Sequence, residues 1–341
     1  MEQRRLLADS FTYLHPQKHT TLVHKATREY WFLHDTAVAW HGESLYVAYY
    51  HCRQSEMIGH TLIHERVSHD GGVSFGPETI LSAPGDESGL HVPPMLFEID
   101  GELYAYVTRM TGPDICTDIR VMKRAGEIWQ EIGILDDPMI VNGTPQKLDE
   151  FTLLAPGRVA DRPGEKPERA AILKIDANDP AKTELIPMPL PDGEKHPRCP
   201  ESTLFHLGDR WVLLVRNDAG PFWMYESMDG LHYTGPFEVD LPMEASKPFG
   251  GNLTDGGSYL VYNAPNPPER RSKLVLLLAN PGEKEFTQKA ILFWSDDRVA
   301  HRRNWHYPCV AEHDGKLYVS LTAGFKEEEG RDAILLTVDL K

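Results

Sequence analysis

A strand-turn-strand pattern repeats six times along this chain of 341 residues. Each copy has a short head, an apolar run, a turn and a second apolar run, as in HDTAVAWHGESLYVAYY and PESTLFHLGDRWVLLVR. The heads begin at His34, His91, Asn142, Pro200, Phe249 and His306, at separations of 57, 51, 58, 49 and 57 residues. A period of about 50 residues, with two strong and two weaker strands per unit, is typical of a propeller blade. We therefore predict an all-β fold, a six-bladed β-propeller with four-stranded antiparallel blades.

Both ends of the chain fit a closed ring. After the sixth hairpin only one further strand-like run remains, DAILLTVDL, so the last blade lacks a strand. The N-terminal segment, which includes SFTYLH, precedes the first head, and we expect it to supply that outer strand and leave no open sheet edge. No window shows a sustained apolar period of 3.6 residues, so little helix is expected. Residues 1–341 are thus predicted to form a single propeller domain.

Charge and cysteine content exclude several classes of protein. The 51 acidic and 35 basic residues give a net charge of −16 without a basic run, which argues against a nucleic-acid partner. Without a secretory leader or an apolar run of about 18 residues, we expect no membrane association and a cytoplasmic location. The four cysteines lack CxxC spacing and are expected to be free thiols of a reducing compartment. The oligomeric state is not indicated.

Two turn motifs recur in phase with the hairpins. Residues 68–75 read SHDGGVSF and residues 227–233 read SMDGLHY. In this S-x-D-x-G pattern the Asp side chain caps backbone N–H groups, and the following aromatic ring packs beneath the blade. We predict that Asp70 and Asp229 stabilise turns and take no part in chemistry.

Hairpins with these Asp-boxes in phase resemble the sialidase superfamily, over about residues 32–325. The resemblance implies an active site on the axis, at the face where each hairpin begins and ends. PESTLFHLGDRWVLLVR is similar to the family segment that carries a Glu and a substrate-binding Arg, which assigns Glu201 and Arg216 to these roles and places them side by side. HYPCVAEHDGKLYV resembles the segment headed by the nucleophilic tyrosine, here Tyr307. The implied enzyme is an exo-glycoside hydrolase that cleaves a terminal acidic sugar, its carbohydrate partner, with Glu201 accepting the Tyr307 proton.

Other roles follow from the same resemblance. YNAPNPPERRSKLVLLL is similar to the fifth-blade stretch that carries an arginine of the carboxylate-binding triad, so Arg271 or Arg270 is the candidate. HCRQSEMIGH occupies the place of the loop that bears the acid/base carboxylate, and Glu56 is its acidic residue. Asp35 is the alternative for that role.

The first arginine of the family triad is absent from this chain. The family has Arg-Ile-Pro at the head of the first blade, whereas this sequence has HDT from His34. Arg109 and Arg158 end the second strands of units two and three, in register with Arg216, and are candidates to supply positive charge. The resemblance is therefore to sialidase-like proteins in a broad sense rather than to strict sialidases.

Three histidines leave an alternative open. His34, His91 and His306 each occupy the first head position of consecutive units in a closed ring. Their imidazoles are candidates to contact the substrate or, with Glu201 or Asp35, to hold a divalent metal. The alternative function is a propeller-fold polysaccharide or oligosaccharide lyase that uses these histidines, with or without a metal, whereas the hydrolase requires no cofactor.

A further alternative is a carbohydrate-binding propeller without catalysis, because a fold alone establishes no activity. Four aromatic residues near the expected axial loops are candidates to stack on sugar rings: Trp31, Trp223, Tyr225 and Trp305. The carboxylates, arginines and tyrosine at the hairpin heads favour an enzyme.

Overall fold

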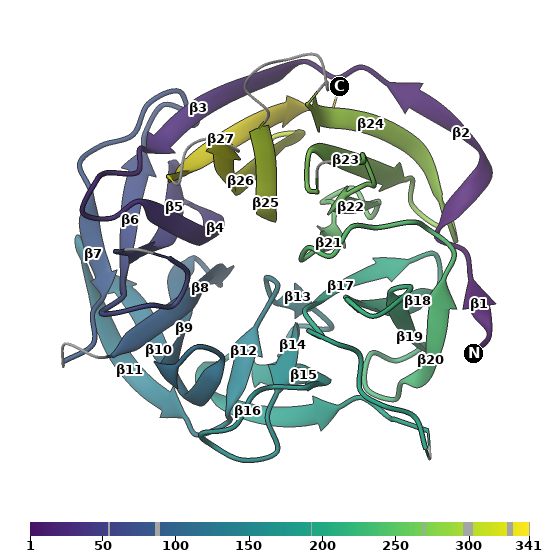
Figure 1. The fold of residues 1–341 in the computed structure, drawn as a ribbon, viewed down its shortest axis with the longest axis horizontal. Helices are drawn as coiled ribbons and strands as arrows, with labels where there is room; N and C mark the ends of the chain where they lie inside the picture. The colour runs from purple at the N-terminus through teal and green to yellow at the C-terminus, as the bar shows by residue number, and fades with distance from the viewer. Residues whose placement is uncertain are drawn as a thin grey trace.

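The chain folds into a ring of six blades around a central axis (Figure 1). The computed structural model describes residues 1–53, 55–85, 89–191, 193–268, 270–295, 303–325 and 330–340, which contain strands and loops but no helix. The described residues thus include no helix that is long and apolar enough to cross a membrane. The prediction of an all-β, six-bladed propeller is confirmed.

The strands follow one another outward from the axis in each blade (Figure 1). Blade one consists of β4 (Phe32–His41), β5 (Ser44–Cys52), β6 (Leu62–Ser68) and β7 (Thr79–Ser82). Blade two consists of β8 (Leu90–Ile99), β9 (Glu102–Gly112), β10 (Ile115–Ala125) and β11 (Ile128–Leu135). Blade three consists of β12 (Met139–Val141), β13 (Gln146–Lys147), β14 (Thr152–Val159), β15 (Arg169–Asp176) and β16 (Asp179–Pro187), with β12 and β13 both paired to β14.

The second half of the ring repeats this order. Blade four consists of β17 (Ser202–Leu207), β18 (Arg210–Val215), β19 (Trp223–Ser227) and β20 (Thr234–Val239). Blade five consists of β21 (Phe249–Asn252), β22 (Ser258–Asn263), β23 (Lys273–Ala279) and β24 (Phe286–Trp294). Blade six contains β25 (Arg303–His313), β26 (Lys316–Phe325) and β27 (Arg331–Asp339), so three of its strands come from the C-terminal end.

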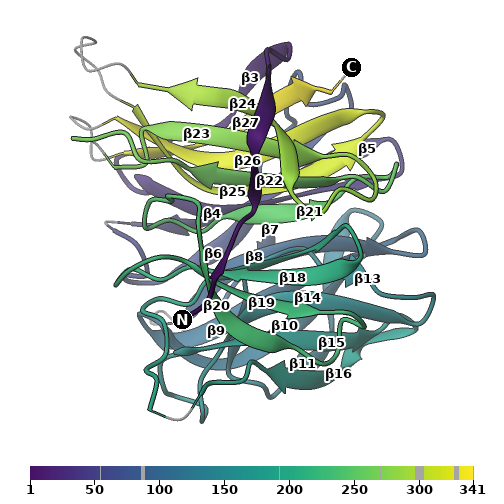
Figure 2. The same ribbon diagram turned by 90° about the vertical axis from the view of Figure 1, so that its right-hand side faces the viewer.

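The N-terminal segment closes the ring from outside. β3 (Lys18–His24) pairs antiparallel with β27 and completes blade six, which confirms that this segment supplies the missing strand. The SFTYLH run belongs mainly to β2 (Leu7–Leu14), which instead adds a parallel fifth strand to β24 of blade five. β1 (Gln3–Arg4) does the same for β20 of blade four. The segment therefore runs along the outside of three blades and covers their edges (Figures 1 and 2).

The inner strands are buried on both faces because neighbouring blades cover them. Every residue of β22 is buried, as is every residue of β18 after its first. Such strands read as continuous apolar runs instead of alternating ones, which is why the second run of each hairpin stands out in the sequence. Blade packing of this kind fixes the position of each hairpin end at the axis.

Both Asp-boxes form the turns that the sequence predicts. Asp70 Oδ1 accepts hydrogen bonds from Ser68 Oγ at 2.7 Å and from the Ser74 N–H at 2.9 Å. Asp229 Oδ1 accepts equivalent bonds from Ser227 Oγ and from two backbone N–H groups. The four cysteines are free thiols, also as predicted.

Removal of residues 1–24 should destabilise the ring, because β27 would present an unpaired edge at the last blade. We expect a lower thermal midpoint together with dimers or aggregates formed through that edge. Thermal denaturation and size-exclusion chromatography with light scattering measure both effects. Removal of residues 1–5 is the matched control, since it takes away only β1. Equal stability of the two truncated chains would contradict a closing role for β3.

Candidate active site

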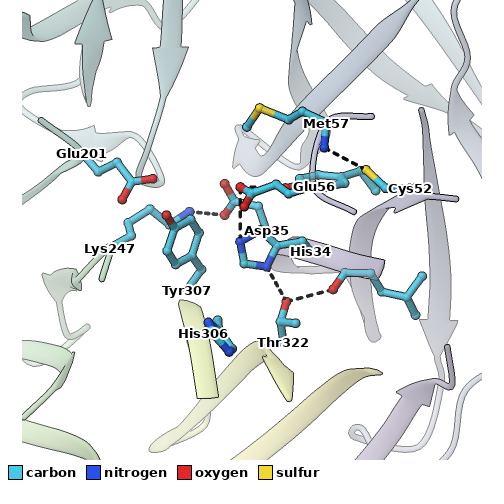
Figure 3. Close-up of polar contacts among 12 residues, drawn as sticks. His34, Asp35, Cys52, Glu56, Met57, Glu201, Lys247, His306, Tyr307 and Thr322 are labelled. Carbon is cyan, nitrogen blue, oxygen red and sulfur yellow. Dashed lines mark hydrogen bonds and ion pairs between the residues drawn. The ribbon is translucent and has the colours of Figure 1, made fainter. Parts of the chain in front are cut away.

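The inner strands of three blades share an irregularity at the axial face. β4, β8 and β25 each change register just after their head histidine. The residue that follows is Asp35 in β4 and Tyr307 in β25, with φ angles of 44° and 51°. Residues other than glycine rarely adopt such angles, and backbone strain of this kind tends to occur at functional sites. The register change turns Asp35 and Tyr307 toward a common centre (Figure 3).

Glu201 and Arg216 meet at the open ends of the blade-four hairpin. The Arg216 N–H donates to the Glu201 carbonyl at 2.8 Å, which holds the two strand ends together. Arg216 Nη1 donates both to Glu201 Oε2 at 2.5 Å and to the Tyr307 hydroxyl oxygen at 2.9 Å. Arg216 Nε and Nη2 donate to Asp218 at 2.7 and 2.9 Å. The predicted adjacency of Glu201 and Arg216 is confirmed, and Arg216 connects this pair to Tyr307.

The protonation states of these groups follow from burial and from their neighbours. Burial opposes ionisation of Glu201, but the charges of Arg216, Arg158 and Lys247 hold its pKa below the usual value. Burial and the Glu201 charge raise the pKa of Tyr307 well above its usual value, and Arg216 acts in the opposite direction. An ionised carboxylate therefore stands beside a neutral phenol, which can attack only if its proton is removed.

Lys247 is a member of the site that the sequence did not reveal. It lies just before β21, its side chain is 1% exposed, and its Nζ atom donates to Asp35 Oδ1. The same Nζ atom lies 5.2 Å from the centre of the Tyr307 ring. Burial raises the pKa of Asp35 despite this partner. In the sequence Lys247 lies two residues before the fifth head, Phe249, and therefore outside the hairpin repeat.

Glu56 lies in the loop after β5 and reaches the same centre (Figure 3). Its side chain remains 41% exposed, with Oε1 3.7 Å from His34 Nε2 and 3.4 Å from the Tyr50 hydroxyl. Desolvation, followed by repulsion from Glu201 and Asp35, raises the pKa of Glu56 to about 7. A carboxyl group with that pKa holds a proton near neutral pH, as a general acid must. Between the two candidates for this role the geometry favours Glu56, because Asp35 is engaged by Lys247.

Arg271 approaches Tyr307 from blade five. Its guanidinium carbon lies 5.2 Å from the Tyr307 ring centre, and its Nη1 atom lies 2.8 Å from His306 Nδ1. Its Nε and Nη2 atoms donate to the Ala245 carbonyl, which leaves N–H groups on both terminal nitrogens for a ligand. Arg270 is exposed, so Arg271 is the better candidate of the pair.

Two of the head histidines flank the tyrosine. The His34 ring lies 4.5 Å from the Tyr307 ring and 6.1 Å from the His306 ring. Burial lowers the pKa of both imidazoles well below the usual value, so both are neutral near neutral pH. His34 Nδ1 contacts Thr322 Oγ1 at 3.1 Å, which fixes the ring (Figure 3).

His91 and Arg109 do not join this group. His91 Nδ1 contacts Ser82 Oγ at 2.7 Å, and Arg109 Nε donates to Asp118 at 2.8 Å. Both line a separate cleft of about 320 Å³ with Arg120. Across the ranges that the structure describes, His34, His91 and His306 do not form a group with metal-binding distances. The alternative of a metal held by these three histidines therefore has no geometric support, although His34 and His306 remain beside Tyr307.

Arg158 lies closer to the axial group than Arg109 does. It is buried, donates to Asp114 Oδ1 at 2.9 Å and lies 3.9 Å from Cys199 Sγ. Burial opposes its charge, but Glu201 and Asp114 outweigh that effect and raise its pKa. The positive charge of Arg158 therefore favours the ionised form of Glu201 by electrostatic attraction.

The aromatic residues proposed for sugar stacking are mostly part of the core. Trp223 and Tyr225 are buried in β19, and Trp305 stacks on Phe293 with ring centres 4.7 Å apart. These rings pack in the apolar clusters between neighbouring blades. The expectation that they present faces to a sugar is wrong for these three residues.

The fold is that of a sialidase-like six-bladed propeller. The sequence model of the BNR repeat-like domain matches residues 44–319, and the chain therefore belongs to this family. No curated protein matches the chain in sequence.

Solved sialidases share the fold at low sequence identity. The sialidase of Trypanosoma rangeli, in complex with 2,3-difluorosialic acid as a covalent intermediate, gives a TM-score of 0.69 at 12% identity over 95% of this chain and 59% of that one. NanB sialidase from Streptococcus pneumoniae gives 0.68 at 9% identity over 94% and 70%. Phage phi92 endosialidase gives 0.66 at 10% identity over 100% and 75%. This chain thus spans about three fifths of the T. rangeli sialidase chain.

Substitution of Lys247 by Met should destabilise the fold by about 3–5 kcal/mol, because it leaves the buried Asp35 without its partner. Adding Asp35→Asn should restore a large part of that loss. Urea denaturation of the single and double variants measures the coupling. Lys284→Met is the matched control, since its ion pair with Asp209 is exposed and should contribute less than about 1 kcal/mol. Additive effects of Lys247→Met and Asp35→Asn would contradict the pairing.

Proposed function

We propose that this protein is an exo-glycoside hydrolase that removes a terminal acidic sugar from a glycan or glycoside, with Tyr307 as nucleophile. The observation that carries the proposal is the shared contact of Arg216 Nη1 with Glu201 and with the Tyr307 hydroxyl. Through this contact one guanidinium nitrogen binds both the buried Glu201 carboxylate and the neutral Tyr307 phenol. Glu56 lies on the other side of the Tyr307 ring (Figure 3).

The proposed reaction has two steps and retains configuration. Tyr307 attacks the anomeric carbon while Glu201 accepts the phenol proton, Arg216 stabilises the developing charge, and Glu56 protonates the departing glycosidic oxygen. Water then cleaves the tyrosyl-sugar bond, Glu56 accepts the water proton, and Glu201 returns its proton to Tyr307. Both carboxyl groups end in their starting states.

Positive charge around Tyr307 supports an acidic sugar. Arg271 retains N–H groups that can bind a substrate carboxylate, and Arg158 adds its field from blade three. Arg216 is already committed to Glu201 and Asp218 and would hold the catalytic pair in place. Among acidic sugars the T. rangeli complex makes nonulosonic acids the first class to test.

Tyr307 should become covalently labelled by 2,3-difluorosialic acid, the compound bound as a covalent intermediate in the T. rangeli sialidase. Mass spectrometry of digested protein should locate the adduct on the peptide that contains Tyr307. Tyr307→Phe should lose the adduct and lower kcat/KM on an aryl glycoside of the same sugar by at least about 10³-fold. Tyr13→Phe, an exposed substitution, is the control. Full activity of Tyr307→Phe would exclude this mechanism.

The activity should fall as the pH rises through about 7, because Glu56 then loses the proton that the leaving oxygen needs. Glu56→Gln should abolish this alkaline limb and lower kcat/KM by about 10²–10⁴-fold on substrates with a poor leaving group. The loss should be much smaller on nitrophenyl glycosides, whose leaving group needs no proton. Glu43→Gln, at an exposed turn, should leave the pH profile intact. An unchanged alkaline limb in Glu56→Gln would remove Glu56 from the role.

A further inference from the structure

A second group of ionisable side chains lies away from the axis, at the seam between blade six and blade one. His24 ends β3, His51 lies in β5, and Glu78 immediately precedes β7. One ligand atom from each lies within 4.8 Å of the others. Among the residues that the structure describes, no other His, Cys, Asp or Glu group meets this condition.

The two imidazoles converge on one carboxylate oxygen. His24 Nδ1 lies 3.1 Å and His51 Nε2 lies 3.2 Å from Glu78 Oε2. His51 is 4% exposed, and its Nε2 atom has no well-aligned hydrogen bond despite the short distance. A buried nitrogen that is aimed at an oxygen without a formed bond is costly unless something else satisfies it.

Further polar groups surround the Glu78 carboxylate. The Tyr49 hydroxyl donates to Glu78 Oε2 at 2.7 Å. His64 Nε2 lies 3.7 Å from Glu78 Oε1, and the His64 Nδ1 atom is buried without a hydrogen-bond partner. The His64 ring lies 4.1 Å from the His51 ring. Three imidazoles therefore face a single carboxylate, and His64 lies on the side of its other oxygen, Oε1.

The two separations from Glu78 Oε2 are close to those between ligands of a tetrahedral zinc ion. Zn–N bonds and Zn–O bonds of about 2.0–2.1 Å place neighbouring ligand atoms about 3.3–3.4 Å apart. The measured separations of 3.1 and 3.2 Å differ from this by a few tenths of an ångström. Two imidazoles with a carboxylate are also a ligand set that zinc and similar divalent metals favour.

We propose that His24, His51 and Glu78 bind one divalent transition-metal ion of the zinc type, which fastens the closing strand β3 to blade one. The ligands come from both sides of the seam, since His24 belongs to the strand that completes blade six. Arg66 Nη1 already donates across the seam to the Val23 carbonyl at 3.0 Å. The ion adds a bond at the point where the ring closes and stabilises the folded chain by binding to it alone.

Titration of the chelator-treated full-length chain with Zn²⁺ tests the site. Isothermal calorimetry should give one ion per chain, and Co²⁺ should give the visible absorption of a tetrahedral complex. His24→Gln and Glu78→Gln should each lower the affinity more than about tenfold, and Tyr49→Phe, which removes only a bond to Glu78, by about tenfold. His19→Gln, an exposed substitution on the same strand, should bind like the wild type.

Hydrogen exchange tests the fastening role. Zn²⁺ should slow amide exchange in β3 of the wild type and of His19→Gln, but not of His24→Gln, and should leave β10 unchanged. Circular dichroism in chelator shows beforehand that each variant is folded, and Tyr49→Phe keeps all three ligands should a ligand variant unfold. Absence of Zn²⁺ binding, or equal binding by the wild type, His24→Gln and Glu78→Gln, would overturn the site. Binding without an effect on β3 exchange would overturn the fastening role.

Discussion

The pairing of β3 with β27 is the contact on which the rest of the structure depends. It joins residues near the two ends of the chain and gives the last blade its outer strand. A single parallel bridge, Arg331 to Phe32, adds a direct link between blades six and one. Because each blade packs only against its two neighbours, an open seam would leave the first and last blades each without one partner. The position of every hairpin end at the axis follows from this closure.

Closure brings together side chains that are far apart in the sequence. Asp35, Glu201 and Tyr307 belong to blades one, four and six, yet they share a few charged neighbours (Figure 3). Backbone conformation also helps to bring these side chains together, since Asp35, Tyr307 and the neighbouring Arg271 all have positive φ angles. Such strained conformations persist only where the surrounding structure imposes them. The packed ring supplies that constraint.

Periodicity made the fold predictable, because each blade repeats the same burial pattern. The adjacency of Glu201 and Arg216 was also predictable, since the ends of a hairpin must meet. The partners of these groups were not: Lys247 lies two residues outside the repeat as it was defined, and Asp218 is selected only by the orientation of Arg216. The expected place of His91 at the axis was wrong, because an equivalent head position in the sequence does not fix the direction in which the side chain points.

The head of the first blade, where the resemblance to sialidases would place an arginine, carries Asp35 paired with Lys247. Lys247 brings a cation to that region, but Asp35 neutralises it, so the pair adds no net charge. Arg216 is likewise balanced by Glu201 and Asp218. A substrate carboxylate would therefore be held chiefly by Arg271, with one strong bidentate contact in place of a triad. Under the proposed function, Arg271 thus binds the carboxylate of the acidic sugar, and contacts to the shape and hydroxyl groups of the sugar supply the rest of the specificity.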